Sequence, residues 1–246
     1  MPNAIVTGAS RGLGLGIACR LADAGHDVIA VARNPSDELS AAIQERCRKA
    51  PACGALLFRP FDLSKVSGLH GFVTSLHHEF GSLGCLVNNA GLGTPGVLAT
   101  MSDESIEHLI HLNVTSPIVL TKYVVRAMMV SGGARIVNIA SIVASSGFRG
   151  LSVYAATKAS LIGFTRSLAR EVGSLGITVN AVAPGFVATE MTRELGPGHR
   201  TQIARRSALG RMALIDDVAS AVEFLVSPAA ANITGTVLTV DAGATA

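Results

Sequence analysis

The sequence has few charged residues and no long uninterrupted apolar run. Charged residues make up 15% of the 246 residues, and hydrophobic residues make up 49%. A membrane-spanning helix needs roughly 18 consecutive apolar residues. No such run occurs, so we expect no membrane association. The start of the chain, from Asn3 to Gly8, reads as a core strand rather than a secretory signal, which favours a cytoplasmic protein.

Cysteine is scarce, and neither cysteine nor histidine occurs at metal-site spacing. The four cysteines form no CxxC pair, and isolated thiols of this kind are often buried and inert. His77-His78 and His108-x-x-His111 lack carboxylate partners at ligand spacing. We therefore predict neither a disulfide nor a metal site.

The sequence also lacks a strong charge of one sign. Its net charge is +3, and the 20 lysines and arginines are dispersed along the chain. Nucleic-acid-binding domains gather such residues into a basic stripe. We therefore expect no nucleic-acid partner, whereas a small anionic ligand remains compatible with this composition.

What the chain does contain is a regular alternation of short β-branched runs and helix-length segments. Strands separated by helices favour parallel pairing through right-handed crossovers. We predict an α/β fold with a Rossmann-like, doubly wound, seven-stranded parallel sheet and helices on both faces. Residues 1–246 would form a single domain for dinucleotide binding and catalysis. The predicted strands are 4–7, 28–32, 56–58, 85–87, 136–139, 177–182 and 236–240.

The segment 185–210 follows no single period. It contains Pro197, glycines and several arginines, and segments of this kind are common in substrate lids. A solvated surface loop with a short helix is the alternative.

A glycine-rich turn follows the first predicted strand and opens a helix. Its glycines are Gly8, Gly12 and Gly14, a spacing that differs from the GxGxxG fingerprint. Backbone N–H groups at a helix N-terminus can hold a pyrophosphate, although plain turn chemistry would also use glycines. The turn predicts a dinucleotide site that includes Ser10, Arg11 and Leu13.

The end of the second predicted strand has no acidic residue. An enzyme that prefers NAD places an acid there, on the ribose 2′-hydroxyl, whereas this chain has Arg33. A guanidinium suits a 2′-phosphate, so Arg33 and Arg11 predict NADPH/NADP as the cofactor. The alternative is that both arginines are ordinary surface charges.

Tyr154 and Lys158 are four residues apart, which places them on one helix face. An ammonium about 4 Å from a phenol could lower the phenol pKa toward neutrality and create a proton donor. By composition such a pair arises by chance with a probability of about 3%. Ser141 follows a predicted strand and could bind a substrate oxygen, although serine is also a common turn residue.

The order and spacing of these motifs resemble the short-chain dehydrogenase/reductase family along essentially the whole chain. Within it, Thr7 to Gly12 and Pro184 to Thr192 are most similar to the 3-oxoacyl-acyl-carrier-protein reductases. The resemblance implies that Lys158 binds the nicotinamide ribose and that Asn113 holds a water in a proton relay. It also implies cofactor contacts from Asp62, Leu63, Asn89, Ala90, Gly91, Pro184, Gly185, Val187 and Thr189.

The expected substrate site departs from those reductases. Phe148 and Leu151 stand where the relatives often have polar residues, so we expect a more apolar mouth. Val143, Phe186 and Met191 are the other expected substrate contacts, beside Ser141 and Tyr154.

Expected partners differ as well. Gly132 and Leu175 occupy positions where the relatives carry arginines that receive the carrier protein, and Arg126, Arg135, Arg149 or Arg170 could replace them. Docking of an acyl carrier protein is therefore an open alternative. Family resemblance implies a homotetramer, with the apolar helix 118–130 either at the subunit interface or in core packing.

Our principal hypothesis is NADPH-dependent reduction of a ketone to a secondary alcohol, with a 3-oxoacyl thioester as the first candidate substrate. Two alternatives stay open. The chain could oxidise another hydroxylated metabolite with NAD(P), or it could be a non-catalytic dinucleotide sensor with the same fold.

Overall fold

A seven-stranded parallel sheet forms the centre of the computed structural model, which describes residues 3–48, 53–129, 132–188 and 197–246. The strand order is β3-β2-β1-β4-β5-β6-β7, so the direction of winding reverses between β1 and β4. This arrangement confirms the predicted doubly wound fold. The strands are β1 Asn3–Thr7, β2 Val28–Ala32, β3 Leu56–Pro60, β4 Leu83–Asn88, β5 Arg135–Ile139, β6 Thr178–Pro184 and β7 Val237–Val240.

Burial explains why these strands read as continuous apolar runs. Strands β4 and β6 are buried at every residue, as expected for a parallel sheet covered on both faces. The predicted strand 85–87 starts two residues earlier, at Leu83, and the strand predicted over 56–58 continues to Pro60. The ends of these strands are not apolar runs, because Arg59 and Pro60 still pair with β2 and Gly84 lies at an irregularity in the pairing of β4 with β1.

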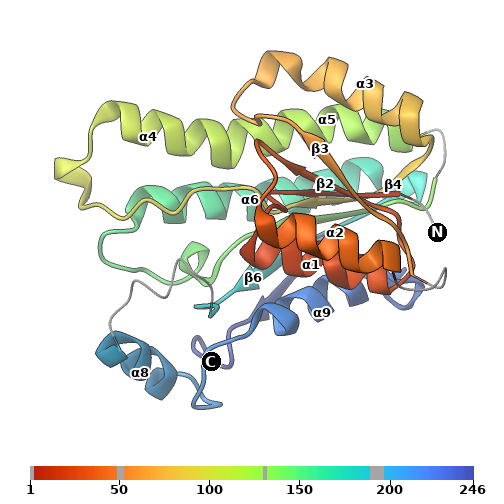
Figure 1. Ribbon diagram of the computed structural model, residues 1–246. Coiled ribbons are helices and arrows are strands. Elements are labelled where there is room, and N and C mark those ends of the chain that lie inside the picture. Colours follow the sequence, from red (N-terminus) through yellow and green to blue (C-terminus); the bar gives the residue numbers. More distant parts are fainter. Residues whose placement is uncertain (1–2, 49–52, 130–131, 189–196) are drawn as a thin grey trace.

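Helices cover the sheet in two layers (Figure 1). In one layer, α1 and α9 pack side by side and bury Ile17, Leu21 and Val222 against the sheet. In the other, α3, α5 and α6 bury Val73, Val124 and others. The helices are α1 Gly12–Asp23, α2 Asp37–Arg48, α3 Leu69–Phe80, α4 Asp103–Ile110, α5 Ser116–Met128, α6 Ser152–Val172, α8 Pro197–Arg206 and α9 Ile215–Val226.

Two serines carry helix-start signals in the sequence: Ser102 precedes Asp103 and Glu104, and Ser64 follows Asp62. Ser102 caps α4 as its pattern indicates, because its hydroxyl accepts a hydrogen bond from the Ser105 N–H at 3.3 Å. A start at Ser64 would be the equivalent expectation after Asp62, and it is wrong. The Ser64 hydroxyl donates to the Asp62 carboxylate at 2.8 Å, and α3 begins only at Leu69.

The predicted apolar helix 118–130 is α5. Its residues Leu120, Val124 and Met128 are buried against the sheet, so core packing accounts for one face of this helix. Half-buried side chains such as Val119 and Tyr123 flank that face. None of the helices in the described part of the chain is both long and apolar enough to cross a membrane.

The irregular segment 185–210 is described at both of its ends. Residues 185–188 follow β6, and α8 lies apart from the sheet, near the C-terminus (Figure 1). Thr189 and Met191, which we expected at the cofactor and the substrate, lie outside the described residues.

Candidate active site and cofactor cradle

The expected site residues gather at one edge of the sheet, beyond the carboxyl ends of the strands. Gly8 follows β1, Asn89 follows β4, Ser141 comes shortly after β5, and Pro184 ends β6. The winding reverses between β1 and β4, and ligands of open α/β sheets bind at such a switch point. The topology therefore brings the glycine turn and the Ser-Tyr-Lys set to the same edge.

The glycine turn is tightly packed on one side and open on the other. Gly8 and Gly12 have φ values of +65° and +57°, a conformation that favours glycine. A Cβ on Gly14 would overlap the carbonyl oxygen of Gly8 and the side-chain nitrogen of Asn89, whereas a Cβ on Gly12 would meet nothing within 4 Å. Since the first turn of α1 also has no acidic residue, its N-terminus fits an anionic group such as a pyrophosphate.

Thr7 ties the glycine turn to the loop after β4. Its hydroxyl accepts hydrogen bonds from the N–H groups of Asn89 and Ala90, both at 3.0 Å, and donates to the Val87 carbonyl at 3.2 Å. In return, the Asn89 amide donates to the Thr7 carbonyl at 2.9 Å. The sequence did not reveal this role of Thr7, because a threonine at the end of an apolar strand carries no distinguishing signal.

The ends of β2 and β3 place a cation beside a carboxylate. Arg33 is exposed just after β2. A hydrogen bond from Ser64 lowers the pKa of Asp62, and the positive charge of Arg33 lowers it further. Leu63, next to Asp62, is buried. The Asp62 carboxylate thus accepts hydrogen bonds from Ser64, and the exposed Arg33 lies near enough to act on its charge.

The other turn residues have mixed roles. Arg11 is exposed and is the N-cap residue of α1, although its side chain makes no capping hydrogen bond. Ser10 accepts a hydrogen bond at its carbonyl from the Ser36 hydroxyl, which joins the turn to the start of α2. Leu13 packs against the core below α1.

Asn113 lies in a π-helical turn, His111–Thr115, between α4 and α5. Its side chain is 1% exposed. The amide nitrogen donates to the Leu92 carbonyl at 2.8 Å and to the Thr157 hydroxyl at 3.1 Å, and the amide oxygen accepts from the Leu92 N–H at 2.8 Å. Such turns often mark functional sites. Both N–H groups of the amide are used, whereas its oxygen accepts a single hydrogen bond and could accept a second.

Gly91 shows how closely Asn113 and Lys158 approach each other. A Cβ on Gly91 would lie 3.1 Å from Asn113 Oδ1 and 3.5 Å from Lys158 Nζ. The loop after β4, the π-turn and α6 therefore meet at one point. Thr157 of α6 accepts a hydrogen bond from Asn113 of the π-turn. Nothing in the sequence indicated this contact except that Thr157 is next to Lys158.

Ser141, Tyr154 and Lys158 are brought together as expected. Tyr154 and Lys158 lie on α6, and Lys158 Nζ is 5.8 Å from the centroid of the Tyr154 ring. Lys158 as a whole residue is 4% exposed, and its ammonium donates a hydrogen bond to the Ile139 carbonyl at 2.8 Å. Ser141 forms a side-chain hydrogen bond with Tyr154, and its hydroxyl also accepts a bond from the Val143 N–H at 3.4 Å.

We expected Lys158 to lower the pKa of Tyr154, and for the protein without a bound ligand this expectation is wrong. Burial raises the pKa of Tyr154, and the hydrogen bond from Ser141 opposes only part of that rise. Burial also lowers the pKa of Lys158 to about 8. The physical reason is that desolvation dominates for both groups, and the ammonium points to a backbone carbonyl rather than to the phenol oxygen.

The low pKa of Lys158 predicts a pH-dependent stability. Unfolded lysine keeps its proton up to a pH of about 10.4, whereas Lys158 loses it near 8. Between these values the unfolded state binds more protons, so stability rises with pH. Relative to Lys158→Met, the free energy of unfolding of the native chain should rise by about 2 kcal/mol from pH 7 to pH 10. Urea unfolding at several pH values, without added nucleotide, measures this difference, and a flat difference would contradict it.

The residues expected to contact the substrate differ in how much surface they expose. The rings of Phe148 and Phe186 are in edge-to-face contact, with centroids 5.7 Å apart, and Leu151 is half-buried nearby in sequence. Val143 is 6% exposed, so it offers little free surface to a substrate.

The residues expected to contact the cofactor at the end of β6 and just after it pack against later parts of the chain. Pro184 and Val187 are buried, and a Cβ on Gly185 would lie 2.6 Å from Asp241 Cβ. Val187 also pairs with Ala213 in an isolated bridge. The backbone of residues 184–187 is therefore fixed against the C-terminal part of the chain.

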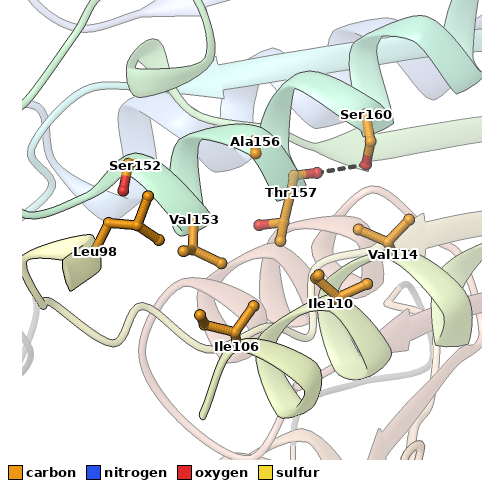
Figure 2. Close-up of a pocket in the computed structure, with 9 residues that line it drawn as sticks. All are labelled: Leu98, Ile106, Ile110, Val114, Ser152, Val153, Ala156, Thr157 and Ser160. Carbon is orange, nitrogen blue, oxygen red and sulfur yellow. Dashed lines mark hydrogen bonds between the residues drawn. The ribbon is translucent and has the colours of Figure 1, made fainter. Parts of the chain in front are cut away.

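A separate pocket of about 490 Å³ lies on another side of α6. Figure 2 shows Val153, Ala156 and Thr157 of α6 facing Ile106 and Ile110 across it. Tyr154 and Ser141 do not line this pocket. Within the described ranges, no cluster of three or more histidine, cysteine, aspartate or glutamate residues could hold a metal ion.

Comparisons with known proteins agree with this geometry. A family model described as enoyl-(acyl carrier protein) reductase matches residues 8–245. The 3-oxoacyl-[acyl-carrier-protein] reductase FabG of Escherichia coli is 42% identical over 240 residues, covering 98% of this chain and 96% of its own. The enzyme of the same name from Pseudomonas aeruginosa is 39% identical with the same coverage.

Solved structures show the same fold. A short-chain dehydrogenase from Burkholderia cenocepacia in complex with NADP has a TM-score of 0.91 and 36% identity, covering all of this chain and 98% of its own. A short-chain dehydrogenase/reductase from Serratia marcescens has a TM-score of 0.92 and 34% identity, with the same coverage. All of these relatives span nearly the full length of this chain.

Proposed function

This chain belongs to the short-chain dehydrogenase/reductase family, and we propose that it reduces the ketone of a 3-oxoacyl thioester with NADPH. The observation that carries the proposal is the meeting of Ser141, Tyr154 and Lys158 at the edge of the sheet where the loop after β4 contacts both Lys158 and the glycine turn. A hydroxyl, a phenol and a buried ammonium at the switch point of the sheet are what a ketone reductase needs.

In this proposal, each catalytic side chain has a distinct task. Bound NADPH supplies the hydride that reduces the ketone carbon. Ser141 donates a hydrogen bond to the ketone oxygen, and Tyr154 gives its proton to that oxygen as the alcohol forms. Lys158, held by the Ile139 carbonyl at 2.8 Å, binds the ribose. Asn113 fixes the loop at Leu92 that faces Lys158.

The protein groups fit the cofactor at three points. The N-terminus of α1 is open and free of acids at its first turn, Gly12 leaves room for a phosphate, and Arg33 is exposed after β2. Asn89, Ala90 and Gly91 present the loop after β4 on the other side of the turn. Residues 184–187 complete the cradle beyond β6.

A spectrophotometric screen tests the proposed function. NADPH oxidation is followed with acetoacetyl and longer 3-oxoacyl thioesters, with an enoyl thioester, and with simple ketones and quinones. The proposal expects the 3-oxoacyl thioesters to give the highest kcat/KM. A higher kcat/KM for the enoyl thioester or for a quinone would overturn the choice of substrate, and the absence of turnover with every compound would favour a non-catalytic nucleotide-binding protein.

Arg33→Ala tests the cofactor preference. Loss of a charge-assisted hydrogen bond of roughly 1.5–3 kcal/mol should weaken NADPH binding about 10-fold to 100-fold, while NADH affinity should stay nearly constant. Isothermal titration with both nucleotides measures the two changes. Arg170→Ala, at an exposed position on α6, is the matched control and should leave both affinities unaltered. Equal weakening of NADPH and NADH would rule out a role for Arg33 at the 2′-phosphate.

Two finer features belong to the proposal. An acyl carrier protein would have to dock without the arginines that Gly132 and Leu175 replace, so a smaller thioester is an equally good substrate. Arg126, Arg149 and Arg170 are exposed and available to an acidic carrier. We also propose that the protein is cytoplasmic and that it forms a homotetramer. Sedimentation at several concentrations tests the oligomeric state.

A further inference from the structure

Two aromatic rings from different loops meet at the outer side of the proposed site. Phe148 lies between β5 and α6, and Phe186 lies two residues beyond the end of β6. Their centroids are 5.7 Å apart, with an angle of 71° between the ring planes. Edge-to-face pairs at this separation are attractive by about 0.5–1.5 kcal/mol beyond their burial.

The strand register places this pair relative to the reacting groups. Ile139 of β5 pairs with Val182 of β6, so the same register brings Ser141 level with Pro184. Phe186 is then two residues, or roughly 7 Å, further out along the strand direction. Phe148 precedes Tyr154 by six residues and reaches Phe186 by its ring contact. The pair therefore lies on the outward side of Ser141 and Tyr154.

The backbone on the Phe148 side is fixed. The Leu151 N–H donates to the Phe148 carbonyl at 3.2 Å, and the Gly96 N–H donates to the Gly150 carbonyl at 2.8 Å. Gly150 has a φ of +77°, which favours glycine and shapes the turn. The loop that carries Phe148 is therefore held by the loop after β4.

The backbone on the Phe186 side is fixed as well. The Gly185 N–H donates to the Val240 carbonyl at 3.0 Å, and the Ala188 N–H donates to the Ala213 carbonyl at 3.0 Å. Since hydrogen bonds hold both loops, the rings of Phe148 and Phe186 stay in contact between them. We call this pair of rings the aromatic wall.

The chemistry of this wall fits one end of a 3-oxoacyl thioester. The rings offer apolar surface and neither a charge nor a hydrogen-bond donor, so they suit the hydrocarbon tail rather than the polar thioester arm. We propose, on the basis of the proposed function, that Phe148 and Phe186 close the acyl side of the ketone site and restrict this enzyme to substrates with a short acyl tail. Truncating either ring then opens the wall to longer tails.

Comparing two chain lengths tests this proposal. For the native chain, Phe148→Ala and Phe186→Ala, kcat/KM is measured with acetoacetyl and 3-oxooctanoyl thioesters. The native enzyme should prefer the shorter one, and each variant should shift the ratio toward the longer one by about tenfold or more, as expected for pocket contacts with added methylene groups. In the double variant the ratio should shift little more than in the single variant with the larger shift, because removing one ring already opens the wall.

Phe72→Ala is the matched control. Phe72 stacks on Phe61 with ring centroids 4.3 Å apart, so this variant also loses an aromatic pair, but on α3. Its ratio of the two substrates should equal that of the native chain even if its stability falls. A ratio unchanged in the Phe148 and Phe186 variants, or a native enzyme that already prefers the longer thioester, would overturn the proposal.

A binding measurement separates this proposal from the proposed function. Calorimetric titration of both thioesters into the protein with NADP⁺ gives a ratio of affinities without turnover. If the native chain reduces neither thioester, the proposed function fails, and the affinity ratio decides on the wall alone. A ratio that shifts only in the two wall variants supports it, and a ratio that stays constant overturns it.

Discussion

Tyr154→Phe should lower kcat with NADPH and a 3-oxoacyl thioester by about 10²-fold to 10⁴-fold, the range for losing a general acid. The substitution removes one oxygen atom and keeps the ring on α6. Because Tyr154 contacts Ser141 through that oxygen, the proton donor is lost while the packing of the helix remains. Steady-state kinetics measure the loss, and circular dichroism with thermal unfolding shows whether the fold is intact.

The other tyrosine of the chain provides the control. Tyr123 lies on α5, where its ring contacts His70 and lies near the side chains of Lys122 and Arg126. Tyr123→Phe removes the same atom away from the proposed site, so kcat should remain within about twofold of the native value, since surface substitutions change little. Normal turnover by Tyr154→Phe would show that another group donates the proton.

Gly14→Ala should destabilise the chain by about 3 kcal/mol and sharply weaken NADPH binding, because overpacked sites cost about this much. The added Cβ would overlap the carbonyl oxygen of Gly8 and the side chain of Asn89. The turn must then move away from the loop after β4, which disrupts the brace between Thr7 and Asn89. Urea unfolding and nucleotide titration measure the two effects.

Gly71→Ala is the matched change with the opposite sign. Gly71 lies within α3, and a Cβ there would meet nothing within 4 Å. Replacing an unstrained helical glycine by alanine should stabilise the chain by about 0.5–1 kcal/mol, with NADPH affinity unchanged. Similar stabilities of the Gly14 and Gly71 variants would mean that the turn has more room than the packing indicates.

The fold and the main site could be predicted because their signals are local and repeated. Each strand is a short apolar run because a parallel sheet is buried on both faces, and a spacing of four residues on a helix puts Tyr154 and Lys158 on one side. The start of α3 at Leu69 could not be predicted in the same way, since the Ser64 hydroxyl bonds Asp62 instead of capping a helix end.

Other site residues depend on contacts between distant segments. Thr7 bonds Asn89, 82 residues away, and Asn113 bonds Thr157, 44 residues away. No pattern within a window of sequence distinguishes these threonines from others. The ring contact of Phe148 with Phe186 also joins two loops that only the order of β5 and β6 makes neighbours.

The amino-acid order by itself predicted the sheet, the glycine turn and the pairing of Tyr154 with Lys158, because periodicity and spacing act along the chain, whereas Ser141 joined that pair through the resemblance to a known family. Tertiary structure decided the direction in which the pKa values of Tyr154 and Lys158 shift and the shape of the space around these side chains. Burial moves the pKa of Tyr154 upward and that of Lys158 downward, opposite to what an exposed pair would do. Desolvation depends on everything packed around a group, and that surrounding exists only once the chain has folded.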